Sequence, residues 1–325
     1  GRSMASRAIS AGAALQGRGA VREFAEHKKS VHALAWNCTG TRLATGSVDA
    51  TAHVWTGLAD DGKGREAHVE LKGHQDGVEQ LCWDPYHPDR LATASGDRTL
   101  RIWDARAARC TTVVETKGEN INAAWSREHH IAVGSKEDDL TVVDARKGKA
   151  LKVVRFPYEV NEMTWEPSGA FLFLSTGMGT VEVVDYGELI RTGKADSVRS
   201  LHGHTANCYC VKMSPCGDRF ASGGADALVS VWSLPDLVCT YTLTRLEWPV
   251  RTISFSHDGA LLASGSEDAF IDVADSATGD QVASIPNRVA MNSIAWHPSA
   301  YLLAFAGDYK DRDEGMFRVF GYPSS

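Results

Sequence analysis

The sequence predicts an all-β fold, a seven-bladed β-propeller, because a similar unit recurs seven times between Ala20 and Tyr322. Each unit holds an apolar segment ending in a large residue, a turn, a strand of small residues, a tight acidic turn and a further strand. Successive units lie 40 to 48 residues apart, close to the roughly 40–45 residues of a four-stranded propeller blade. The residues that end the first segments are Trp36, Trp83, Trp125, Trp165, Met213, Phe255 and Trp296.

The second unit shows the strand pattern most clearly, reading LKGHQDGVEQLCWDP and then RLATASGDRTLRIWD. Val78, Leu81 and Trp83 supply an apolar face, while Gly96 and Asp97 form the turn between the next two strands. A single four-stranded sheet cannot bury both of its faces, so we expect the blades to stack radially around one axis.

Three units carry a repeating set of polar residues, and in this they resemble the WD-repeat family. In that family a histidine, a serine or threonine, an aspartate and a tryptophan form a buried chain of hydrogen bonds. The matching sets are His27, Thr45, Asp49 and Trp55; His74, Thr93, Asp97 and Trp103; and His204, Ser222, Asp226 and Trp232. The sixth unit keeps only Ser264 and Asp268, whereas the third, fourth and seventh keep the strand spacing without the polar set.

The polar sets suggest a hydrolase at first sight, but their positions favour a structural role. A catalytic serine must be exposed beside its base and an oxyanion donor, whereas these hydroxyls lie in mid-strand and recur from blade to blade. Cys208 and Cys210 form a C-x-C pair without a second pair at zinc spacing. We therefore expect no enzyme activity, no catalytic residues, no metal and no cofactor.

The repeat runs nearly end to end, which indicates one propeller domain over residues 20–325. Residues 1–19 are rich in Ala, Gly and Ser and are predicted to be a flexible tail, whose Gly1, Arg2 and Ser3 before Met4 look like a cloning remnant. The seventh unit offers strands only near 291–296, 301–306 and 316–321, one short of four. An extra strand over 21–25 is expected to complete that blade and close the ring.

Composition narrows the classes of partner. The net charge is −7 and the pI about 5.9, which argues against broad binding to nucleic-acid phosphates. The sequence has no apolar run long enough to span a membrane and no leader pattern. Its seven cysteines form no disulfide framework. These features predict an intracellular protein without membrane contact. Because a propeller buries its core internally, we expect the isolated protein to be a monomer.

Three sets of residues are candidates for binding another protein. Positions four residues before each aligned large residue should surround the mouth of the channel: His32, Glu79, Ile121, Asn161, Tyr209, Arg251 and Asn292. Loops after the third strands should form a basic rim with Arg106, Arg109, Arg146, Lys147, Lys149, Arg191 and Lys194. Turns after the second strands should form an acidic face with Glu137, Asp138, Asp139, Glu267, Asp268 and Asp308. A water-filled mouth and ordinary solvated loop charges are the competing interpretations.

Trp248 and two long loops complete the candidates. Trp248 stands where other units have a Gly-His turn, and it is expected to plug the core, with a partner anchor as the alternative. The loop with GLADDGKGREAH after Trp55 and the loop with YKDRDEG after Asp308 are longer than their counterparts. Such loops bind partners or remain disordered.

Several segments resemble one branch of the WD-repeat proteins, the family of THO complex third subunits. These segments are HQDGVEQLCWDP, ATASGDRTLRIWDAR, TKGENIN, GGADALVSVW and EWPVRTISFSHDGALLASGSEDAFIDVA. The resemblance covers most of residues 22–322 and includes units that lack the polar set. It implies a nuclear, non-enzymatic scaffold in the assembly that couples transcription to mRNA packaging and export (TREX). Partners would be the large helical THO subunits and, through them, the export helicase and mRNA–protein particles, with little direct contact to RNA.

A second interpretation is a substrate receptor of a cullin ubiquitin ligase. Trp103, Asp104, Ala105 and Arg106 match the W-D-x-R pattern of such receptors. An arginine two residues after the WD pair also occurs in ordinary blades. The sequence leaves this alternative open.

Overall fold

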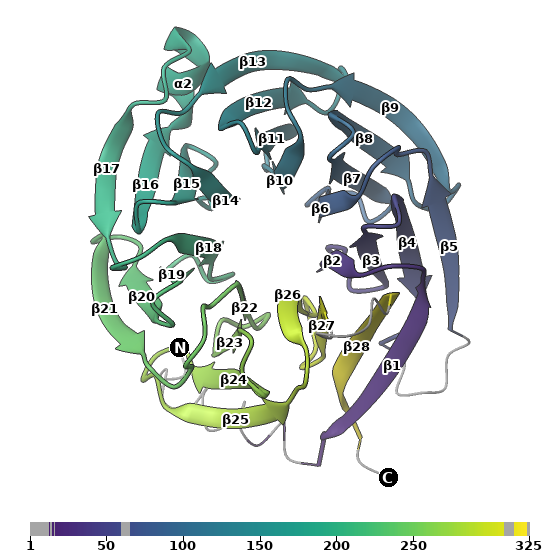
Figure 1. Ribbon diagram of the computed structural model, residues 1–325, viewed down its shortest axis with the longest axis vertical. Helices are drawn as coiled ribbons and strands as arrows, with labels where there is room; N and C mark the ends of the chain where they lie inside the picture. The colour runs from purple at the N-terminus through teal and green to yellow at the C-terminus, as the bar shows by residue number, and fades with distance from the viewer. Residues whose placement is uncertain (1–12, 14, 16, 60–65, 309–314, 324–325) are drawn as a thin grey trace.

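The computed structural model is a ring of seven four-stranded antiparallel sheets around a central channel (Figure 1). It describes residues 13, 15, 17–59, 66–308 and 315–323. The predicted all-β, seven-bladed propeller is confirmed. Each sheet is one blade, and its first strand lies innermost, beside the channel (Figure 1).

The first four blades follow the chain in order. Their strands are, for blade 1, β2 (Val31–Trp36), β3 (Arg42–Ser47), β4 (Thr51–Thr56) and β5 (Ala67–Lys72); for blade 2, β6 (Val78–Trp83), β7 (Arg90–Ser95), β8 (Thr99–Asp104) and β9 (Arg109–Glu115); for blade 3, β10 (Asn120–Trp125), β11 (His130–Ser135), β12 (Asp139–Asp144) and β13 (Lys149–Arg155); and for blade 4, β14 (Val160–Trp165), β15 (Phe171–Thr176), β16 (Thr180–Asp185) and β17 (Ser197–His202).

The last three blades close the ring. Their strands are, for blade 5, β18 (Cys208–Met213), β19 (Arg219–Gly224), β20 (Val229–Ser233) and β21 (Val238–Leu243); for blade 6, β22 (Thr252–Phe255), β23 (Leu261–Gly265), β24 (Phe270–Asp275) and β25 (Gln281–Pro286); and for blade 7, β26 (Ala290–Trp296), β27 (Leu303–Asp308), β28 (Gly315–Tyr322) and β1 (Ala20–His27).

Blade 7 is built from both ends of the chain, as the sequence predicted. β1 pairs with β28 in an antiparallel register in which Phe24 faces Phe317. The two rings stack with centroids 4.9 Å apart, and Phe24 also meets Trp55 of blade 1 edge-on at 5.7 Å. Figure 1 shows the N-terminal strand in purple beside the C-terminal strand in yellow. The ring is thus closed by hydrogen bonds and by aromatic packing.

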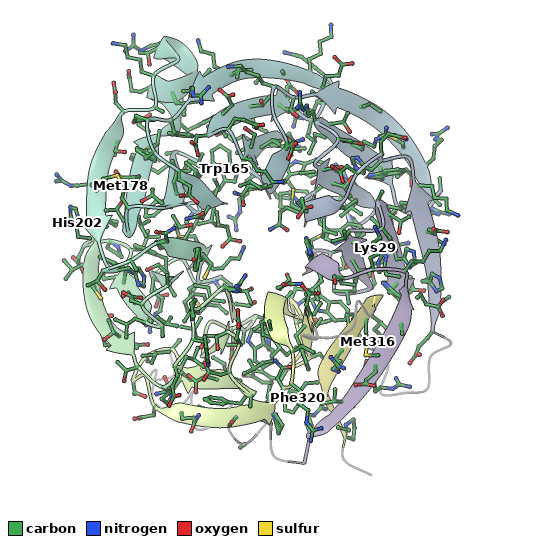
Figure 2. All side chains as sticks on the ribbon, in the orientation of Figure 1. Lys29, Trp165, Met178, His202, Met316 and Phe320 are labelled. Carbon is green, nitrogen blue, oxygen red and sulfur yellow. The ribbon has the colours of Figure 1, made fainter. Side chains whose placement is uncertain are left out.

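The core lies between blades. Both faces of the second and third strands are covered by neighbouring blades, so β3, β7 and β11 are each buried at five of their six residues. Small residues let the blades approach: a Cβ on Gly46 would lie 2.6 Å from Val78 of the next blade, and one on Gly265 would lie 2.6 Å from Ile294. The side chains fill the spaces between sheets while the centre of the ring stays open (Figure 2).

One helix departs from the predicted all-strand pattern. α2 (Tyr186–Thr192) follows β16, where blades 2, 3, 5 and 6 have a short turn. Asp185 caps its first turn by accepting a hydrogen bond from the Glu188 N–H, and Gly193 ends it in the left-handed conformation with φ of 74°. The D-x-x-E spacing and the following glycine are helix boundary signals that were present in the sequence.

Parts of the chain treated in the sequence analysis lie outside the described residues. These are most of the predicted tail, residues 60–65 of the long loop after Trp55, and residues 309–314 of the loop after Asp308. Within the tail, Leu15 is partly buried against the core cluster of blades 6 and 7. No helix in the described part of the chain is long and apolar enough to cross a membrane.

Candidate protein-interaction surfaces

The three polar sets lie inside the blades and hold strands together. In blade 2, His74 Nε2 lies 2.7 Å from Thr93 Oγ1 and His74 Nδ1 lies 2.8 Å from Asp97 Oδ2. Trp103 Nε1 donates to the same threonine hydroxyl at 2.8 Å. Equivalent chains join the members of the other two sets, in blades 1 and 5. These residues are engaged with one another and form no open catalytic arrangement.

The aspartates of these sets are held in their charged form. Burial alone would raise the pKa of Asp49, but hydrogen bonds from His27, Thr51 and the Lys28 N–H hold that pKa far below its usual range. The pKa of Asp97 is lowered in the same way. The turn between the second and third strands is therefore fixed by a carboxylate with several donors.

The seven positions predicted to surround the channel mouth line one cavity of about 500 Å³. His32 Nδ1 and Glu79 Oε2 are 2.8 Å apart across the junction of blades 1 and 2. Asn161 Nδ2 donates to the Cys208 carbonyl at 2.9 Å. Arg251 Nη2 pairs with Glu267 at 3.0 Å. Tyr209 lines the mouth alongside them.

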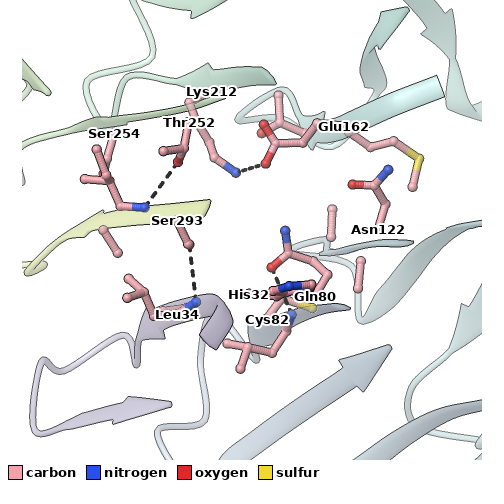
Figure 3. Close-up of a pocket in the computed structure, with 18 of the residues that line it drawn as sticks. His32, Leu34, Gln80, Cys82, Asn122, Glu162, Lys212, Thr252, Ser254 and Ser293 are labelled. Carbon is pink, nitrogen blue, oxygen red and sulfur yellow. Dashed lines mark hydrogen bonds and ion pairs between the residues drawn. The ribbon is translucent and has the colours of Figure 1, made fainter. Parts of the chain in front are cut away.

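Deeper in the channel the wall carries an ion pair that the sequence analysis did not single out. Lys212 Nζ lies 2.5 Å from Glu162 Oε1 (Figure 3). The other oxygen of Glu162 accepts the Val211 N–H at 2.9 Å. Burial opposes the charge on Lys212, but Glu162 raises its pKa above the usual value. Both residues belong to innermost strands, and this position in the repeat was the sequence signal that could have identified them as channel-lining.

Neighbouring innermost strands are also joined by neutral hydrogen bonds. The Ser293 hydroxyl of blade 7 accepts the Leu34 N–H of blade 1 at 3.3 Å, and the Thr252 hydroxyl of blade 6 accepts the Ile294 N–H at 3.1 Å (Figure 3). Asn122 Nδ2 donates to the Asn161 carbonyl at 2.6 Å. Because these polar groups already have partners, the channel is a fixed tube that offers a preformed mouth.

The expectation that Trp248 plugs the core is wrong, because its side chain is 51% exposed. Asp268 accepts the backbone N–H groups of Glu247 and Trp248 at 3.1 and 3.2 Å, which fixes the loop. Leu246 and Val250, on either side of the tryptophan, enter the core in its place. The alternative, a partner anchor, remains a proposal.

The predicted acidic face is partly neutralised by neighbouring cations. Arg251 pairs with Glu267 at 3.0 Å, and Lys117 pairs with Asp139 at 3.2 Å. Asp139 is 4% exposed and lies at the start of β12, so it contributes little to the surface. The contrast between the faces is therefore weaker than the sequence suggested.

The remaining candidates lie away from the channel mouth. Arg106 and Arg146 are exposed in the turns after the third strands of blades 2 and 3, and their N–H groups are held by Asp104 at 3.0 Å and Asp144 at 2.9 Å. Asp308 is half-buried at the end of β27. The described residues contain no group of three or more His, Cys, Asp or Glu side chains placed to hold a metal ion.

Comparison with known proteins places the chain in a family. The family described as the THOC3 beta-propeller domain matches residues 27–306. The chain belongs to the THOC3 β-propeller family. It is 52% identical over 309 residues to "THO complex subunit 3" of Arabidopsis thaliana, covering 94% of this chain and 96% of that protein.

Two further relatives match at lower identity. "WD repeat-containing protein AAC3" of Dictyostelium discoideum is 30% identical over 93% of this chain and 67% of its own length. Mouse "Striatin-4" is 26% identical over 78% of this chain and 35% of its own length. The resemblance to THO third subunits inferred from the sequence is confirmed, and it extends through blades without the polar set.

Proposed function

We propose that this protein is a non-enzymatic scaffold subunit of the THO complex. The observation that carries the proposal is the 52% identity to a THO complex subunit 3 over nearly the full length of both chains. The rigid ring supports it, because innermost strands cross-linked by hydrogen bonds present their loops in a fixed arrangement. A scaffold needs such fixed surfaces and no reacting groups.

In this proposal the propeller binds the large helical THO subunits and, through them, is linked to the export helicase and to mRNA–protein particles. It acts in the nucleus, where the complex couples transcription to mRNA packaging and export. Contact with RNA is indirect, in keeping with the net charge of −7. The isolated chain is a monomer, because a closed propeller buries its core without a second copy.

The candidate binding residues divide between two ends of the ring. The channel mouth, with His32, Glu79 and Tyr209, offers a concave polar surface for a protein segment. In the loop before β22, the exposed indole of Trp248 supplies the large amphipathic surface typical of interface anchors. Arg106 and Arg146 lie in turns on the opposite face.

The experiment that tests the function is affinity capture of the tagged protein from nuclear extract, with and without nuclease, followed by mass spectrometry. Recovery of the helical THO subunits in both conditions supports a scaffold that binds proteins directly. Recovery that disappears with nuclease contradicts direct binding, and recovery of a cullin adaptor in place of THO subunits contradicts the proposal as a whole. Light scattering on the isolated chain tests the monomer.

A further inference from the structure

An apolar groove of about 730 Å³ lies at the junction of blades 4 and 5, away from the channel. Its walls include Phe171 and Val183 of blade 4 and Leu234 and Leu237 of blade 5. Val198 and Arg199 of the outer strand β17 border it. The groove is distinct from the predicted binding residues, none of which lines it.

The groove exists because this junction lacks the polar bridge found at others. At the first position of the second strand, Arg90 of blade 2 donates to the Ala145 carbonyl of blade 3 at 3.0 Å. His130 of blade 3 meets the Tyr186 hydroxyl of blade 4 at 2.8 Å. The residue at this position in blade 4 is Phe171, which reaches toward blade 5 without a polar partner to meet.

The helix in blade 4 leaves the groove uncovered. α2 replaces the short turn after the third strand, and its Tyr186 and Leu189 pack into the cluster shared with blade 3. The chain then crosses to β17, where Val198 remains 49% exposed. The side of blade 4 that faces blade 5 therefore keeps accessible apolar surface at this end.

One wall of the groove carries a leucine in the left-handed backbone conformation. Leu237 has a φ of 54°, in the left-handed region, at a turn position where blades 3 and 6 carry Gly148 and Gly279. A leucine there is strained relative to glycine. Its side chain lines the groove and, like Phe171 and Leu234, packs against the buried cluster beneath.

The charges around the groove define the partner. Glu166 accepts the Ser168 N–H at 3.0 Å, and Asp185 accepts the Glu188 N–H at 2.9 Å, so both carboxylates have local donors. The side chain of Arg199 is exposed and forms no hydrogen bond or ion pair with the described residues. An apolar floor beside an available guanidinium complements a segment with large apolar side chains and a carboxylate.

We propose that the groove between blades 4 and 5 docks an apolar, acidic segment of another THO subunit, with the carboxylate on Arg199 and the apolar side chains against Phe171 and Leu237. This inference rests on the proposed function. It assigns one specific contact surface within the complex.

The test measures binding of the full chain to the remaining THO subunits, reconstituted without it, by biolayer interferometry. Val198→Asp and Arg199→Glu are expected to weaken binding by about tenfold or more. The matched control is Val113→Asp in blade 2, since Val113 is also 49% exposed and lies outside the groove. Groove variants that bind as tightly as the control would overturn the inference. Failure of the unaltered chain to bind at all would overturn the proposed function and the inference with it.

Leu237→Gly separates binding from folding. Glycine relieves the left-handed backbone while it removes an apolar contact, so the thermal unfolding midpoint should stay within about 3 °C of the unaltered protein. Binding should nevertheless fall about fivefold or more, because the groove loses part of its wall. The control is Ala108→Gly, at the same turn position in blade 2 with φ of 49°, which should keep full affinity. Full affinity of Leu237→Gly would contradict the inference.

Charge exchange tests the acidic part of the occupant. Asp and Glu residues of the bound subunit are replaced singly by Lys and tested against Arg199→Glu. At least one replacement should restore affinity to this variant while weakening binding to the unaltered chain. If none does, the occupant is not acidic at this position, and that part of the inference is wrong.

Discussion

Blades 2 and 6 share one backbone plan but hold their strands together differently. In blade 2 the hydroxyl of Thr93 joins His74 and Trp103 in a closed chain of hydrogen bonds. In blade 6 the corresponding hydroxyl, Ser264, is buried and has no hydrogen-bond partner among the described residues. The blade instead relies on an ion pair between the half-buried Arg245 and the buried Asp272, and on Asp268, which holds the loop before the blade.

The difference shows that blade stacking and the strand pattern determine the fold of a blade. The polar residues that stabilise the blade can be replaced by a different set. Blade 4 illustrates a third solution, in which Glu182 accepts hydrogen bonds from Thr180 at 2.7 Å and from Ser200 at 2.6 Å. A buried polar group is tolerated once it has a partner, whichever residue supplies it. Blades without the polar set can therefore keep the fold while they present different surface residues.

The largest effect is expected from removing the strand that completes blade 7, a blade without the polar set. Deleting residues 20–26 exposes the edge of β28 and removes Phe24 from its stack on Phe317. We expect no cooperative thermal transition by circular dichroism. Deleting residues 4–19 should lower the midpoint by only a few degrees, about 2–4 °C, through the lost contact of Leu15. Similar melting curves for both truncations would contradict closure by β1.

The ion pair of blade 6 should be the next most sensitive feature. Arg245 meets both oxygens of Asp272, at 2.9 and 2.7 Å, and Asp272 is 1% exposed. Asp272→Asn leaves the guanidinium without a countercharge, so we expect a loss of about 3 kcal/mol in the free energy of unfolding. Urea titration measures it. A loss below about 1 kcal/mol would show that solvent replaces the pairing.

The direct comparison of the blades substitutes the equivalent hydroxyls. Thr93→Val strands the buried ring nitrogens of His74 and Trp103 and should cost about 2–3 kcal/mol. Ser264→Ala removes a buried hydroxyl that has no partner among the described residues, so the free energy of unfolding should stay the same or rise by up to about 1 kcal/mol. Equal losses in the two variants would mean that Ser264 has a partner in solution. Urea titration of both variants decides.

How far the sequence predicts the molecule depends on whether a feature repeats. The polar sets, the closing strand and the ring of His32, Glu79 and their counterparts followed from periodicity, because equivalent positions in each unit point the same way. The exposure of Trp248 did not follow from periodicity. Which residues of this loop enter the core depends on how Asp268 fixes the loop. The groove was equally inaccessible, because it depends on side chains from two blades and on the path of α2.

A pH dependence should distinguish blade 1 from the divergent blades. His53 stacks on His27 at 3.9 Å and is 4% exposed, and burial and the neighbouring histidines lower its pKa to about 4. The unfolded chain takes up the proton near the ordinary value of 6.5, so stability is lost as pH falls from there toward 4. The loss is about 2–3 kcal/mol.

The matched variant is His53→Phe, which keeps the ring and removes the titration. It should flatten the pH dependence of the free energy of unfolding between pH 6.5 and 4, in part only, because the pKa values of His74 and His297 are also lowered. A dependence identical to that of the unaltered protein would show that His53 titrates normally.

The smallest effect is expected at Arg106, which tests whether a regular blade serves only as structure. Asp104 holds the Arg106 and Ala107 N–H groups at 3.0 Å, so the W-D-x-R pattern is accounted for by a turn whose arginine side chain stays exposed. Arg106→Ala should change affinity for the reconstituted THO subunits by less than about twofold, because a single solvent-exposed charge contributes little. If the affinity fell by more than tenfold, or if the unaltered chain bound a cullin adaptor through this arginine, binding would lie in the regular blades. In that case the blades that carry the polar sets would bind partners as well as stabilise the ring.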